Sequence, residues 1–232
     1  DIVSSPDMRT APRDGDEFLE RLRERHATMM RQRPRALPGQ WKDRANRAGL
    51  TEFVAPHLVP GTLRAGWEEG EGFDDPFRRA TYLMFLVTEV HPFIDGNGRS
   101  ARIAMNNILA AAGHHRIIIP TIQRSSYLDT LTRATNGGGP DGLHSVLDHA
   151  QHWVSRGDWS TIPSGLSYAH STNALIGARE AERDHVYLEI PRWDPVPSSP
   201  PPHRGVARGR TTPGTNNDSF RGREQSEFDQ TS

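Results

Sequence analysis

The residues of this sequence that could do chemistry together lie in one segment, which reads His91-Pro92-Phe93-Ile94-Asp95-Gly96-Asn97-Gly98-Arg99-Ser100-Ala101-Arg102. The imidazole of His91 could act as a general base, and the carboxylate of Asp95 is a ligand type that Mg²⁺ prefers. The two glycines allow successive backbone N–H groups to converge on an anion. Arg99 and Arg102 are spaced i,i+3, so both lie on one face of a helix. This combination indicates a site for phosphates.

Two predicted helices must position this segment. The apolar run 80–87 predicts a buried helix that leads into His91, where Pro92 disfavours the helical conformation. A second helix is expected from residue 99 to about residue 112. Two arginines in its first turn oppose the helix dipole by roughly 0.3 to 1 kcal/mol each, which predicts a bound polyanion that compensates for them.

The segment 91–102 resembles the complete Fic-domain motif, histidine-x-phenylalanine-x-acidic-glycine-asparagine-glycine-arginine-x-x-arginine, without a departure. The likeness extends from about Pro38 to about Glu182. It implies an all-α fold, a helical bundle around two central helices that the motif loop joins, with a small β-hairpin flap. It also implies a nucleotidyltransferase that moves AMP from ATP to a Ser, Thr or Tyr hydroxyl of a target protein.

The resemblance further implies a role for each position of the motif. His91 takes the proton of the attacking hydroxyl, and Asp95 ligates a Mg²⁺ ion that bridges the α- and β-phosphates of ATP. The other implied nucleotide-site residues are Phe93, which anchors the loop in the core, the amides of Gly96, Asn97 and Gly98, the guanidinium groups of Arg99 and Arg102, and Tyr127. In some family members a tyrosine lies against the adenine, but for Tyr127 a core tyrosine is an equal alternative.

A hairpin is predicted upstream of the motif. Residues 40–43 and 50–54 can form short strands around a turn at 46–49, although a loop with two buried aromatic side chains would also fit. The family carries a flap here that begins with glycine-x-x-basic, which Gly39-Gln40-Trp41-Lys42 resembles, with lysine where arginine is more usual. Such a flap is implied to hold the target as an added strand. The implied docking residues are Trp41, Lys42, Phe53 and Val54.

Composition narrows the classes of function. The chain has 232 residues, no cysteine and a formal charge of -1, from 28 basic and 29 acidic side chains. The absence of cysteine excludes disulfides, thiolate-bound zinc and a thiol nucleophile. The balanced charge gives no reason to propose nucleic acid or a membrane surface as a partner. No apolar run approaches the ~20 residues of a membrane-spanning helix, so we expect a soluble protein, cytoplasmic or delivered as an effector.

The rest of the chain is expected to support this site. Residues 1–15 are predicted to be a flexible lead and 66–72 a linker, while a last helix is expected over 166–184. Asp75 followed by Pro76 predicts the start of the first central helix. The expected units are an N-terminal lead and helix (1–37), the Fic domain (38–190, with the flap at about 40–54 and the motif at 91–102) and a disordered tail rich in Pro, Gly and Arg (191–232).

Regulation and two other functions remain open at this level. Many Fic proteins inhibit themselves through a glutamate of a separate helix, and in the best-spaced segment, 172–177, Ile176 replaces that glutamate. We therefore hypothesise that the chain does not inhibit itself in this way, which leaves control to a separate inhibitory partner, to expression, or to a region outside this sequence. The alternative functions are transfer of phosphate, UMP or phosphocholine on the same scaffold, and a non-catalytic nucleotide- or peptide-binding module.

Overall fold

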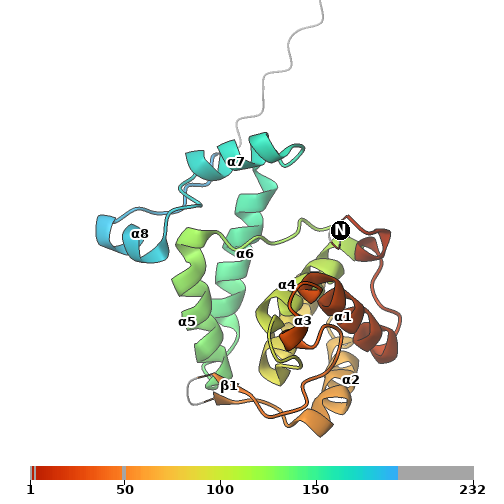
Figure 1. Cartoon of the computed structure of the whole chain (residues 1–232). Coiled ribbons are helices and arrows are strands. Elements are labelled where there is room, and N and C mark those ends of the chain that lie inside the picture. The colour runs from red at the N-terminus through yellow and green to blue at the C-terminus, as the bar shows by residue number, and fades with distance from the viewer. Residues whose placement is uncertain (1, 3, 49–50, 193–232) are drawn as a thin grey trace, which may run out of the picture. The chain divides into compact units, whose positions relative to one another are not determined.

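The computed structural model describes residues 2, 4–48 and 51–192, which are mainly helical (Figure 1). Their α-helices are α1 (Gly15–Met30), α2 (Val59–Gly70), α3 (Pro76–Val90), α4 (Asn97–Ala111), α5 (Arg124–Thr135), α6 (Asp141–Ser155), α7 (Ile162–Ser171) and α8 (Ala178–Asp184). Short 3₁₀ helices span Pro6–Arg9, Pro34–Ala36, Pro56–Leu58 and Thr121–Gln123. The two strands are β1 (Arg47–Ala48) and β2 (Thr51–Glu52). The predicted all-α fold with a small hairpin is confirmed.

The core is built on α3 and α4, the two helices that the motif loop joins. The most deeply buried apolar side chains of these helices are Leu83, Met84 and Val87 on α3 and Ala101, Met105 and Leu109 on α4. Burial of each large apolar side chain contributes about 1.5 to 3 kcal/mol. Helices α1 and α2 pack against this pair, α5 packs against α6, and α6 contacts α3 (Figure 1). The loop therefore leaves and enters the best-packed part of the fold.

Helix α3 begins and ends where the sequence predicts. The carboxylate of Asp75 accepts hydrogen bonds from the backbone N–H groups of Phe77 and Arg78, and Pro76 is the first helical residue. At the other end His91 is the C-cap residue, with a left-handed backbone conformation at a φ of 50°. Left-handed backbone is uncommon for a residue other than glycine. The imidazole thus leaves the helix at the edge of the loop.

The stretch 66–72 was predicted to be a linker, and this prediction is wrong because α2 continues to Gly70. A Cβ atom on Gly66 would lie 2.5 Å from side-chain atoms of Leu86, so only glycine lets α2 approach α3 this closely. Tertiary packing outweighs the low helix propensity of glycine, about 1 kcal/mol relative to alanine. Glycine here permits a close helix contact.

The hairpin exists, but its strands are not those predicted. β1 and β2 are antiparallel, with Arg47 opposite Glu52 and Ala48 opposite Thr51, so β1 falls where the turn was expected. Residues 40–43 form no strand, because the backbone N–H of Lys42 donates to the carbonyl oxygen of Pro92 at 2.8 Å instead of to a strand partner. Residues 49 and 50, between the two strands, lie outside the described residues.

The predicted flexible lead is also wrong for residues 6–10. Met8 is buried, and the carboxylate of Asp7 pairs with Arg25 of α1 at 2.9 Å. The side-chain amide of Asn107 on α4 donates to the carbonyl oxygens of Asp7 and Thr10 at 3.1 and 3.0 Å. The lead is fixed by partners far away in the sequence, which local composition does not reveal.

The last predicted helix, 166–184, is in fact two helices, α7 and α8. In the connection between them Asn173 has a φ of 64°, and the indole N–H of Trp153 donates to the hydroxyl of Thr172 at 2.9 Å. The carbonyl oxygen of Ala174 accepts from the N–H of Thr121 at 2.8 Å. Ile176 therefore belongs to a packed connection and not to a helix. The hypothesis that the chain does not inhibit itself stays a prediction.

Residue 192 is the last that the structure describes, so most of the predicted disordered tail lies outside the described residues. In the described part of the chain no helix is both long and apolar enough to cross a membrane. The domain boundaries at 37/38 and 190/191 stay predictions.

Candidate active site

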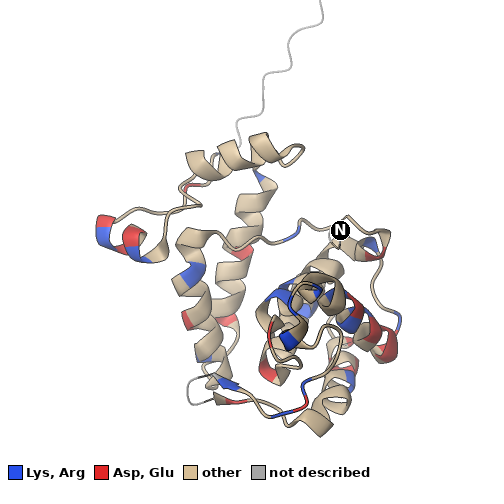
Figure 2. Ribbon diagram, viewed as in Figure 1, with Lys and Arg blue, Asp and Glu red and all other residues tan. Residues whose placement is uncertain are grey.

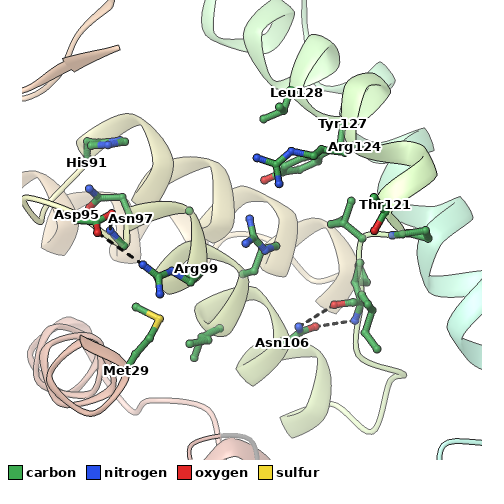
Figure 3. A pocket seen from close by; sticks show the side chains of 18 of the residues that line it. Met29, His91, Asp95, Asn97, Arg99, Asn106, Thr121, Arg124, Tyr127 and Leu128 are labelled. Carbon is green, nitrogen blue, oxygen red and sulfur yellow. Dashed lines mark hydrogen bonds and ion pairs between the residues drawn. The ribbon is translucent and has the colours of Figure 1, made fainter. Parts of the chain in front are cut away.

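A cavity of about 900 Å³ lies between the motif loop, the first half of α4, the extended segment 117–120 and the start of α5 (Figure 3). Its volume falls within the roughly 300 to 1,000 Å³ of small-molecule sites. The predicted residues that line it are His91, Asp95, Gly96, Asn97, Gly98, Arg99, Arg102 and Tyr127. Phe93 does not line it, because its side chain is fully buried. The structure thus brings the predicted base, carboxylate and arginines to one cavity.

His91 is oriented so that one ring nitrogen stays available. Its Nδ1 lies 3.1 Å from the carbonyl oxygen of Thr88, which can only accept, so Nδ1 carries the proton and Nε2 keeps its lone pair. The ring stacks on Phe53 at 3.8 Å between centroids. Burial lowers the pKa of His91, and the positive charge of Lys42 lowers it further, against the hydrogen bond to Thr88. The imidazole is therefore neutral near pH 7 and can accept a proton.

Two residues of the flap segment hold the backbone on both sides of His91. The ammonium group of Lys42 donates to the carbonyl oxygen of Val90 at 3.2 Å and to the side-chain oxygen of Asn46 at 2.7 Å. The side-chain amide of Asn46 in turn donates to the carbonyl oxygens of His91 at 3.4 Å and Phe93 at 3.0 Å. With the Lys42 N–H on Pro92, four consecutive carbonyl groups are bound. These bonds offset the strain of the left-handed residue, about 1 to 3 kcal/mol.

The four predicted docking residues all contact the protein's own motif loop or core. Lys42 is buried, which lowers its pKa to about 8. Trp41 stacks on Phe93 at 5.2 Å, Phe53 stacks on His91, and Val54 packs against the core. These side chains hold the flap against the rest of the protein. Target docking through its main chain stays a prediction.

The motif loop is closed by Asn97, whose side chain is buried. Its oxygen accepts from the N–H of Phe93 and its amide donates to the carbonyl oxygen of the same residue, both at 2.8 Å. The sequence predicted only the backbone amide of Asn97 as functional. Its side chain satisfies two buried backbone groups, each of which would cost about 1 to 3 kcal/mol if left unpaired.

We predict that Asn97→Ala lowers the free energy of unfolding by about 2 to 4 kcal/mol, because two buried partners of the loop lose their hydrogen bonds. Urea denaturation followed by tryptophan fluorescence measures this change. The control is Asn136→Ala, which removes an amide that is exposed and bonded only within its own helix. Equal stability of the two variants would contradict the assigned role of Asn97.

His26 of α1 contacts the motif loop, a role that was not predicted from the sequence. Its ring stacks on Phe93 at 3.7 Å with an interplanar angle of 2°. Nδ1 accepts from the N–H of Gly39 at 3.0 Å, so Nε2 carries the proton and donates to the carbonyl oxygen of Asp95 at 3.0 Å. Burial lowers the pKa of His26 and keeps the ring neutral. The only signal in the sequence was a polar residue on the apolar face of its helix.

Three arginines line the cavity, Arg99, Arg102 and Arg124. Figure 3 shows Arg99 reaching in from α4 and Arg124 from α5. Gly96 precedes α4 with a φ of 85°, and a Cβ atom there would meet sulfur and carbon atoms of two methionines at 3.2 Å, so glycine fits this turn. Asp95 is the one acidic residue among those that line the cavity. Arg124 was not predicted, since its helix lies outside the motif.

The donor set around Asp95 fits Mg²⁺ only together with a phosphate ligand. No group of three or more acidic or histidine side chains suited to a metal occurs among the described residues. Mg²⁺ is commonly held by one or two carboxylates, waters and substrate phosphates. The Asp95 carboxylate is half exposed to the cavity and now pairs with Arg33 at 3.3 Å and Arg99 at 3.8 Å. A cation with its own phosphates would replace these pairings.

Tyr127 is a core tyrosine that also lines the cavity, and its contact with an adenine stays a prediction. Its side chain is buried, and its hydroxyl donates weakly to the sulfur of Met84 at 3.7 Å. Burial raises its pKa, although neighbouring Arg102 acts in the opposite direction. The same residue lines the cavity next to Leu128 (Figure 3). It is a core tyrosine that presents part of its surface to the site.

The arrangement is a helical bundle whose central loop places a histidine, a glycine turn and arginines at one cavity. Comparisons with known proteins show what this chain is similar to. Residues 17–109 match the model of the Fic/DOC family. The chain is 32% identical over 109 residues to "Protein adenylyltransferase Fic" of Drosophila persimilis, which covers 46% of this chain and 22% of that protein. With the Drosophila erecta protein of the same name it shares 32% identity over 142 residues, or 56% and 29% of the two chains.

A solved structure has a similar fold. "Fic-1 (aa134 - 508) from C. elegans" superposes with a TM-score of 0.50 at 24% sequence identity, over 60% of this chain and 42% of that one. Residues 17–109 of this chain are therefore similar to the Fic/DOC family. It spans less than a third of the length of the two Drosophila relatives.

Proposed function

We propose that this protein transfers AMP from ATP to a Ser, Thr or Tyr hydroxyl of a target protein and releases pyrophosphate. The supporting observation is that His91, whose Nε2 no described residue hydrogen-bonds, lines the same cavity as three arginines. A base beside a polyanion site suits attack of a hydroxyl on phosphorus. The names of the Drosophila relatives give the same activity.

In this reaction His91 takes the proton of the target hydroxyl while its oxygen attacks the α-phosphorus. The bond from that phosphorus to the bridging oxygen breaks, and pyrophosphate leaves with the electron pair. Arg99 and Arg102 would neutralise the β- and γ-phosphates, and the amides of the loop's glycines would hydrogen-bond them. Arg124 adds a third cation. The proton on Nε2 returns to solvent when the products leave.

A Mg²⁺ ion held by Asp95 and the phosphates would supply charge neutralisation for the leaving pyrophosphate. The exposed carboxylate and the lack of other acidic lining residues support binding of the ion with the nucleotide and not before it. The protein's own contribution is to hold that carboxylate beside the turn. Gly96 does this, since its N–H donates to the Asp95 side chain at 2.6 Å.

The choice between AMP and another transferred group is tested with ATP labelled at the α- or the γ-phosphorus. The chain is incubated with each label, MgCl₂ and a mixture of proteins. AMP transfer leaves the α label on protein, releases the γ label and adds about 329 Da to the modified chain. Retention of the γ label would indicate phosphate transfer, and absence of both labels with intact ATP binding would indicate a binding module. Either result would overturn the proposal.

The acid limb of the pH–rate profile should have its midpoint below pH 6.5. Burial and the charge of Lys42 lower the pKa of His91, so the neutral ring persists to lower pH than in a free histidine. Activity is full above that pKa and falls as His91 is protonated. Initial rates of AMP transfer between pH 5 and 8 measure the limb, and ATP affinity at the same pH values separates catalysis from binding. A midpoint above 6.5 would contradict the assignment.

A further inference from the structure

A second hollow, of about 540 Å³, adjoins the active-site cavity. Its lining residues are Arg33, Pro34, Arg35 and Ala36, which follow α1, and Ile94 and Asp95 of the motif loop. Ile94 and Asp95 also line the first cavity, so the two hollows share a wall. The second hollow thus borders the cavity that His91 lines.

The hollow lies in a part of the chain with a local excess of positive charge. Residues 25–42 contain no acidic side chain, whereas α5 and α8 each carry both acidic and basic residues (Figure 2). Arg31, Arg33 and Arg35 are all exposed within five positions. Among the described residues, only Arg33 of these three has an ion-pair partner, Asp95 at 3.3 Å. Since the whole chain has a formal charge of -1, this excess is local.

The walls of the hollow favour a peptide over a nucleic acid. Ala36 is buried, and Pro34 and Ile94 add further apolar surface, so the arginines flank an apolar floor. An extended peptide can pack carbon atoms on such a floor while its carboxylates reach the guanidinium groups. A nucleic-acid backbone would instead need a row of cations along its phosphates. Arg33 and Arg35 do not line the nucleotide cavity, so ATP does not account for them.

We propose that this hollow binds an acidic side chain of the target protein beside the hydroxyl that is modified. The inference rests on the proposed AMP transfer and adds to it the chemical class of the target segment. Arg35, which lines the hollow, is the residue that selects it. Arg31 adds a second exposed cation four positions earlier, outside the lining, and neither has an ion-pair partner among the described residues. Exposed ion pairs of this kind contribute about 0.2 to 1 kcal/mol each, so two of them correspond to roughly a twofold to thirtyfold preference.

Fluorescence anisotropy with two labelled peptides tests the inference. Both peptides have one serine in the centre and the same length, and one carries Asp and Glu where the other carries Asn and Gln. The full chain should bind the acidic peptide at least about twofold more tightly at low salt, and added NaCl should remove this preference. The double variant Arg31→Glu, Arg35→Glu should lose it, whereas the charge reversal Arg179→Glu on α8 should keep it.

Three outcomes would overturn the inference. The first is equal affinity of the full chain for the two peptides. The second is that Arg179→Glu loses the preference for the acidic peptide as fully as the double variant does. The third is tighter binding of a single-stranded oligonucleotide of the same charge, which would assign the basic surface to nucleic acid. A thermal melt of each variant checks that it is folded. AMP transfer is scored separately with α-labelled ATP, so its failure overturns the proposed function, while the peptide comparison judges the hollow.

Discussion

Replacing His91 by alanine should lower the rate of AMP transfer by about 10² to 10⁴-fold, the usual contribution of a positioned general base. Affinity for ATP should change little, because the cations that would hold the phosphates lie on α4 and α5 and not on His91. Initial rates with α-labelled ATP measure the first effect, and calorimetric titration with ATP and Mg²⁺ measures the second.

The control for this experiment is His185→Ala. His185 also follows the last turn of a helix with a left-handed backbone, at a φ of 54°, but it caps α8, outside the residues that line the cavity. It therefore reproduces the loss of a left-handed histidine without removing the base. Two results for His91→Ala would contradict the assignment of His91 as the base. One is a wild-type rate of AMP transfer, and the other is an ATP affinity reduced as strongly as the rate.

Replacing Arg102 by alanine should weaken the productive binding of ATP by about 10- to 150-fold. Hydrogen bonds to charged groups contribute about 1.5 to 3 kcal/mol, and Arg102 is a half-buried member of the cavity wall with which a triphosphate could form a bidentate pair. The effect should appear mainly in KM for ATP and in its dissociation constant. Arg102→Lys should recover part of the loss, because lysine keeps the charge but not the planar fork.

Because Arg102 lies beside Tyr127, its removal could also disturb the wall of the cavity. The melting temperature of each variant separates this effect from lost phosphate binding. Arg78→Ala serves as the control, since Arg78 also lies near the start of a central helix but is exposed and pairs with Asp75. An unchanged KM in Arg102→Ala, or an equal change in the control, would argue against a phosphate-binding role.

The segment predicted to be the target-binding flap contacts the backbone around His91, which the sequence did not suggest. Lys42 and Asn46 belong to the segment that leads into the hairpin, yet their hydrogen bonds end on the backbone around His91. Phe53 follows β2 and stacks on the imidazole itself. A target strand added to this hairpin would therefore lie against residues that orient the base. In the proposed reaction, docking and proton transfer share the same small set of contacts.

The sequence by itself determined the features that depend on residues close together along the chain. The motif 91–102 carries its chemistry in twelve positions, and the ends of α3 follow from Asp75 and from Pro92 after His91. The apolar periodicity of α3 and α4 reflects burial on a helix, so the two central helices could be predicted without a structure. These signals are local, because caps, turns and helical faces are formed by neighbours in sequence.

Only the tertiary structure decided which distant residues complete the site. His26, Lys42 and Asn46 hold the motif loop from segments 45 to 69 positions away, and Arg124 reaches the cavity from a different helix. The strands of the hairpin were placed wrongly for the same reason, because the backbone of Lys42 bonds to the loop instead of to a strand. Such partners are chosen by the packing of whole helices, which brings their polar groups together without leaving a periodic pattern in the sequence.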